Sequence, residues 1–184
     1  MGSTEGKVKT GQAPRLRGLV RSSHGYAAVM NQDTKGPGVQ IPPPALMLGV
    51  LLLSAAAEYL WPTSFGLAQW VAFFGLGISL IAILVVVLSI MTFKRHKTHV
   101  EPWKPTSSIV TQGVFAFSRN PIYLSFCLLQ IGGGIWRDSY WVVGGFVFTA
   151  VLIYFLAIRK EEAYLEAKFG EEYVRYKASV RRWI

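Results

Sequence analysis

Two clusters of polar residues hold the side chains with which this chain of 184 residues could perform chemistry. One runs from Ser107 to Tyr123 and ends in Arg119-Asn120-Pro121-Ile122-Tyr123, and the other is Arg159-Lys160-Glu161-Glu162. Carboxylates bind ammonium and hydroxyl groups through charge-assisted hydrogen bonds, and they can also accept a proton. The alternative is that these residues are ordinary charges at helix ends, where surface ion pairs contribute about 0 to 1 kcal/mol.

Long stretches without charge surround the two clusters and predict the elements that position them. No Asp, Glu, Lys or Arg occurs between Glu58 and Lys94, from Asn120 to Trp136, or from Ser139 to Ile158. A bilayer core about 30 Å thick needs roughly 17 to 25 helical residues, and in lipid the backbone must bond within its own helix. We therefore predict an all-α integral membrane fold with four transmembrane helices, at about 44–60, 67–91, 121–136 and 140–158.

The composition favours the same fold class. Charged residues make up only 16% of the chain, against about 25% in soluble domains, which is too few to cover a surface that faces water. The alternative, buried core helices of a soluble protein, would require four such apolar stretches in one small chain. The third and fourth spans form a hairpin, so the two polar clusters should meet at one end of it.

The positive charges lie on one side of the predicted membrane. Of the 19 Lys and Arg residues, six precede Gln40, five lie from Lys94 to Arg119, and seven follow Ile158, while only Arg137 falls in another loop. The positive-inside rule assigns these 18 cations, and with them both termini and the two polar clusters, to the cytoplasm. The net charge of +9 suggests contact with anionic headgroups. No nucleic-acid partner is predicted, because most aromatic residues lie in or beside the spans rather than among the cations.

The chain outside the spans divides into a tail and a C-terminal extension. Residues 1–40 are rich in Gly, Ser, Thr, Lys and Arg and show no apolar period, so we predict a disordered basic tail before a membrane domain at 41–184. Gly170 should end the helix that continues the fourth span. An apolar stripe predicts that the cytoplasmic helical extension packs on the protein or on the membrane: Leu165, Phe169, Tyr173, Tyr176 and Val180.

No metal site and no internal disulfide are predicted. His24, His96 and His99 have no cysteine partners in the sequence. Cys127 is the only cysteine and lies within the third predicted span, where it is interpreted as a small packing residue.

Several spaced blocks resemble the isoprenylcysteine carboxyl methyltransferase and phospholipid methyltransferase superfamily, over roughly residues 93–184. The first block is Ser107 to Tyr123, with its Arg119-Asn120-Pro121-Ile122-Tyr123 end. The others follow in the family's order: Glu161-Glu162-Ala163-Tyr164-Leu165, Phe169-Gly170-Glu171-Glu172-Tyr173, Tyr176-Lys177 and Val180-Arg181-Arg182-Trp183-Ile184.

The resemblance implies methyl transfer from S-adenosylmethionine at the cytoplasmic ends of the last spans. The family's usual His in the first block is Asn120 here, which keeps a hydrogen-bonding side chain. For catalysis we assign Glu162, as the proton acceptor, and Arg119; for the substrate we assign Arg159. The carried-over cofactor-binding residues are Ser107, Ser108, Ile109, Val110, Phe115, Asn120, Pro121, Ile122, Tyr123 and Glu161.

The methyl acceptor stays open between a lipophilic molecule, reached from the bilayer, and a small thiol, amine or carboxylate. In the eukaryotic branch of the superfamily, an Arg one helical turn before the first Glu is tied to substrate recognition. That position is Ala157 here, which argues against a prenylcysteine carboxylate. Two alternatives remain: a phospholipid N-methyltransferase, and a non-catalytic membrane transport or scaffold protein. Transport is disfavoured because no ionisable residue lies in the middle of a span.

Overall fold

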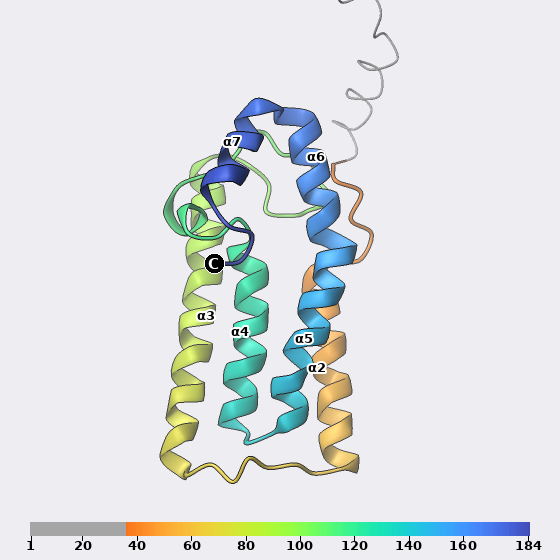
Figure 1. Ribbon diagram of the computed structural model, residues 1–184, viewed down its shortest axis with the longest axis vertical. Coiled ribbons are helices and arrows are strands. Elements are labelled where there is room, and N and C mark those ends of the chain that lie inside the picture. Colours follow the sequence, from red (N-terminus) through yellow and green to blue (C-terminus); the bar gives the residue numbers. More distant parts are fainter. Residues whose placement is uncertain (1–35) are drawn as a thin grey trace, which may run out of the picture.

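The regular structure in residues 36–184, the part of the chain that the computed structural model describes, is helical (Figure 1). Three helices are long and apolar enough to cross a membrane: Pro43–Leu60, Gln69–Arg95 and Tyr140–Phe169. A fourth apolar helix, Pro121–Trp136, is shorter. These helices indicate an integral multi-pass membrane protein, as the charge-free stretches predict.

The helices begin and end close to the predicted bounds. Helix α2 spans Pro43–Leu60 and starts with prolines in its first turn, where their missing N–H is no loss. Helix α3 spans Gln69–Arg95 and runs beyond the predicted end at residue 91, because Lys94 and Arg95 suit the negative end of the helix dipole. Helix α4 spans Pro121–Trp136, as predicted.

The last apolar helix continues out of the bundle, as the sequence indicates. Helix α5 (Tyr140–Ile153) passes into a π-helical turn, η4 (Tyr154–Ile158), and then into α6 (Arg159–Phe169). Gly170 ends α6 with a positive φ of 54°, a conformation that favours glycine. Helix α7 (Glu171–Ser179) follows and turns back over the bundle end (Figure 1).

Small residues allow close contacts between the membrane helices. At Gly134 a Cβ would lie 2.5 Å from the backbone nitrogen of Val143, so α4 and α5 do approach closely there. At Gly132 a Cβ would instead meet the Oγ of Ser79 on α3, also at 2.5 Å. Gly145 faces Ser54 on α2, at 2.6 Å from its Oγ.

Side-chain hydrogen bonds join the two short loops at the lower end in Figure 1. The Glu58 carboxylate accepts bonds from the backbone and hydroxyl of Thr63, both at 2.7 Å, and from the Ser139 hydroxyl. Ser139 in turn caps the first turn of α5 by accepting a bond from the Val142 N–H at 3.2 Å. The Ser64 hydroxyl donates to Asp138. These bonds place the α2–α3 link and the α4–α5 turn on the same side.

The packed chain begins before the predicted boundary at residue 41. Val39 is only 4% exposed and belongs to the core cluster that also contains Tyr123 and Phe126. At Gly36, where φ is +63°, a Cβ would lie 2.5 Å from the carbonyl oxygen of Trp103. The rest of the predicted tail, residues 1–35, lies outside the described residues.

Candidate functional site

The two predicted polar clusters meet at the upper end of the bundle in Figure 1, where α6, α7 and the segment before α4 gather. Residues from all of these elements line one cavity of about 100 Å³. Arg119 and Asn120 come from the start of α4, and Glu161 and Glu162 from the first turn of α6. The predicted meeting of the two clusters is therefore confirmed.

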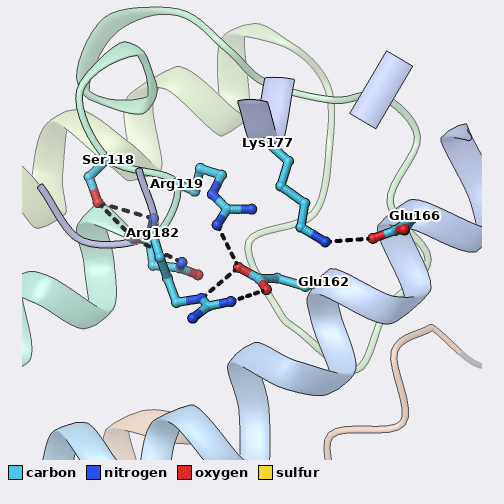
Figure 2. A network of polar contacts seen from close by, with 7 residues as sticks. Ser118, Arg119, Glu162, Glu166, Lys177 and Arg182 are labelled. Atoms are coloured by element: carbon cyan, nitrogen blue, oxygen red, sulfur yellow. Dashed lines mark hydrogen bonds and ion pairs between the residues drawn. The ribbon is translucent and has the colours of Figure 1, made fainter. Parts of the chain in front are cut away.

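Glu161 and Glu162 point to different partners because consecutive residues of a helix lie about 100° apart. The Tyr123 hydroxyl donates a hydrogen bond to the Glu161 carboxylate, which ties α4 to α6. Glu162 is instead held by two arginines (Figure 2). Arg182 donates to both of its oxygens, from Nε at 3.0 Å and from Nη2 at 2.8 Å, and Arg119 Nη2 lies 3.2 Å from Oε1.

Arg119 is buried yet only partly paired. Its side chain is 7% exposed, and within the described residues its Nε and Nη1 atoms have no hydrogen-bond partner. The Ser108 hydroxyl, which lines the same cavity, also has no partner there. Buried N–H and O–H groups are normally hydrogen-bonded, so these unpaired donors set the cavity apart from an ordinary packed interior.

The last five residues, 180–184, form a C-terminal strap over the start of α4. The carbonyl oxygen of Arg182 accepts bonds from the Asn120 amide at 3.1 Å and from the Ser118 hydroxyl at 3.4 Å (Figure 2). The Arg182 guanidinium lies over the Tyr154 ring, 5.1 Å from its centre. Asn120 therefore does not cap α4 with its side chain; it holds the strap. The family resemblance singled out this segment, but no local pattern predicted its contacts.

Helix α7 covers the cavity with two tyrosines. Tyr173 and Tyr176 are 2% and 8% exposed, so the predicted apolar stripe packs on the protein. The Tyr176 hydroxyl donates to the carbonyl oxygen of Phe115 at 2.7 Å. Burial raises the pKa of the Tyr173 phenol to about 12. Neither tyrosine was predicted as a site residue.

Of the predicted site residues outside α6, some line the cavity and others do not. Those that line it are Ser108, Ile109, Val110, Phe115, Arg119 and Asn120. Ser107 is exposed and donates to the carbonyl oxygen of Lys97 instead. Pro121 and Ile122 are not among the lining residues, and Tyr123 reaches the site through Glu161.

Arg159 does not join the other site residues. It is exposed, and its guanidinium lies 5.7 Å from the centre of the Phe155 ring, which is itself 53% exposed. The predicted substrate residue therefore lies on the outer surface of the helix, away from the cavity.

The fold and the site define a helical membrane protein with a cavity lined by polar residues at one end of its bundle. The phospholipid methyltransferase family model matches residues 70–172, which is more than half of the chain, and the chain belongs to this family. The resemblance stated from the sequence is therefore confirmed. The family comprises membrane methyltransferases that use S-adenosylmethionine as the methyl donor.

Three relatives locate the similarity. The chain is 40% identical over 63 residues to an uncharacterized protein of Haemophilus influenzae, across that protein's full length and 34% of this chain. It is 32% identical over 93 residues to a protein-S-isoprenylcysteine O-methyltransferase of Schizosaccharomyces pombe, covering 50% of this chain and 35% of the relative. It is 29% identical over 133 residues to protein-S-isoprenylcysteine O-methyltransferase B of Arabidopsis thaliana, covering 68% of this chain and 66% of the relative.

Proposed function

We propose that this protein is an S-adenosylmethionine-dependent methyltransferase that acts on a lipophilic or small thiol, amine or carboxylate acceptor. The observation that carries the proposal is Arg119, whose buried Nε and Nη1 nitrogens lack a partner within the described residues, beside Glu161 in one cavity. These residues fit the cofactor, because arginine N–H groups suit a carboxylate, and a carboxylate accepts bonds from an ammonium or from hydroxyl groups. Bound S-adenosylmethionine would supply an electrophilic methyl group on a sulfonium.

The chain's own residues would bind the cofactor, orient it toward the methyl acceptor and exclude water. We assign Glu161, Arg119 and Ser108 to holding the cofactor, with Tyr123 fixing the Glu161 carboxylate. Glu162 fits a positioning role better than proton transfer, because both of its oxygens are engaged by arginines. Good alignment of donor and acceptor can supply about 7–11 kcal/mol of the barrier.

Binding requires the cover of the site to move. The cavity of about 100 Å³ is smaller than the roughly 300–1,000 Å³ of small-molecule sites. Pro37 and the loop residues from His99 to Pro102 are among the residues that line it. They belong to no helix, so this loop is a part of the site that can open for a cofactor from the cytosol.

Methyl transfer to isolated membrane lipids and to a farnesylated cysteine analogue tests the activity. Purified protein in nanodiscs receives tritiated S-adenosylmethionine, and the products are separated by chromatography. A carboxyl methyl ester releases its label as methanol in alkali, whereas an N-methyl group keeps it. The family match favours an N-methylated phospholipid, and the S. pombe and A. thaliana relatives favour a carboxyl ester. Failure to transfer to any acceptor and to bind S-adenosylhomocysteine would favour the non-catalytic alternative.

We also propose four membrane crossings with both termini in the cytoplasm. Two observations support this topology. Of the 19 Lys and Arg residues, 18 lie on the proposed cytoplasmic side and only Arg137 lies in another loop. The Ser64 hydroxyl donates a hydrogen bond to Asp138, which puts their two loops on one side. Helix α4 has 16 residues, about 24 Å, which a bilayer can accommodate by local thinning.

Reporter fusions test this topology. Fusions at Ser64 and at Asp138 are expected to report the outside, and a fusion after Ile184 is expected to report the cytoplasm, because the cations are retained on the inner side. Alkaline phosphatase and green fluorescent protein provide complementary readouts. A cytoplasmic signal from the Ser64 fusion would contradict the four-span arrangement.

A further inference from the structure

A second, larger hollow lies in the membrane-spanning part of the bundle, away from the candidate cofactor site. Helices α2 and α3 stand on either side of the α4–α5 hairpin (Figure 1), and α3 packs chiefly on α4 while α2 packs chiefly on α5. A groove of about 820 Å³ is lined by residues of all four helices. Its size is that of a site for a small molecule.

Gln130 on α4 is a buried polar residue among those that line this mostly apolar groove. The residue is 1% exposed and lines the groove, and within the described residues neither its amide oxygen nor its amide nitrogen has a hydrogen-bond partner. Gly145 leaves room for the amide, because a Cβ there would lie 3.2 Å from Nε2. An unpaired amide in a protein interior is costly, and lipid offers no water to relieve it. The groove is therefore suited to a molecule that brings its own hydrogen-bonding group.

The shape and the ends of the groove indicate the kind of molecule. Along α2 the lining runs from Met47 to Tyr59, twelve residues or about 18 Å. One acyl chain spans half of a hydrocarbon core, about 15 Å. Tyr59 and Arg137 line the end of the groove nearest the short loops, and both are exposed. An exposed arginine suits a phosphate headgroup, and a tyrosine at the same end of the groove suits a bilayer interface.

We propose that the groove binds one phospholipid of the bilayer, with an acyl chain along α2 and α4 and an ester carbonyl accepting a hydrogen bond from the Gln130 amide. The headgroup lies at Arg137. This lipid is a resident of the fold and not the methyl acceptor, because Arg137 follows the C-terminal end of α4 whereas Glu161 lies beside the start of that helix. The proposal depends on membrane insertion and not on methyl transfer.

Native mass spectrometry of the full chain in detergent, titrated with phosphatidylglycerol, tests the site. The Gln130→Leu variant keeps the side-chain size and removes the amide, so the affinity for the first lipid is expected to fall about 10-fold, as for the loss of one hydrogen bond. The Gln69→Leu variant makes the same change at an exposed residue at the start of α3 and should bind like the unmodified protein.

A second variant tests the groove without touching the amide. Leu51 lines the groove, and Leu51→Trp would fill it, so binding of the first lipid is expected to be lost while circular dichroism shows an unchanged helix content. Equal lipid affinity in the unmodified protein and in both groove variants would overturn the proposal. An equal loss of lipid affinity in the Gln69→Leu control would overturn it too, since the lipid would then bind at the surface and not in the groove.

Discussion

Replacing Glu161 with glutamine is expected to weaken the binding of S-adenosylhomocysteine by roughly 10- to 150-fold. The substitution keeps the size of the side chain and removes its charge, so a charge-assisted hydrogen bond worth about 1.5–3 kcal/mol is lost. Glu161 lines the cavity, and the Tyr123 hydroxyl holds its carboxylate in place. Isothermal titration calorimetry in nanodiscs measures the affinity directly.

Glu166→Gln is the matched control for this experiment. Glu166 lies on the same helix, but its carboxylate pairs with Lys177 at 2.8 Å on the surface, and their side chains are 46% and 40% exposed (Figure 2). Its replacement should leave binding unchanged within about twofold, because exposed ion pairs contribute little. If Glu161→Gln binds like the control, Glu161 does not contact the cofactor and the proposed site is misplaced.

Replacing Glu162 with alanine is expected to lower the free energy of unfolding by about 3–5 kcal/mol. The substitution leaves Arg119 buried without its carboxylate, and the Arg182 guanidinium loses its two hydrogen bonds to Glu162. Removal of one partner from a buried ion pair costs about 3–5 kcal/mol. It also releases the C-terminal strap from α6. Unfolding in mixed micelles of increasing SDS content, followed by circular dichroism, measures the change.

Glu171→Ala is the control for this experiment. It shows how much stability is lost when a helical glutamate outside the buried ion-pair network is replaced by alanine. Glu171 is exposed in the first turn of α7, so its replacement should cost no more than a surface substitution, about 0.5 kcal/mol. Arg182→Ala should lie between the two, because the Arg182 side chain is 34% exposed and Arg119 still pairs with Glu162. A Glu162→Ala protein as stable as Glu171→Ala would show that the two arginines need no carboxylate.

The sequence alone determined where the helices lie and which residues gather at one end. The charge-free stretches predicted α4, and Gly170 predicted the break between α6 and α7. The family blocks predicted that Arg119 and Glu161 lie in one site, and they line one cavity. These features are readable because hydropathy, proline and glycine act over a few neighbouring residues.

Only the tertiary structure decided what those residues touch. The partners of Glu162 come from positions 119 and 182, and no local pattern connects them. The π-helical turn at Tyr154–Ile158 precedes Arg159, whose side chain lies on the outer surface instead of in the site. Gln130 is one polar residue in an apolar run, and only the packing of the four helices shows that its amide is unpaired within the described residues and that the residue lines a groove. Such contacts join residues far apart in the chain, so they depend on how whole helices pack and not on the local sequence.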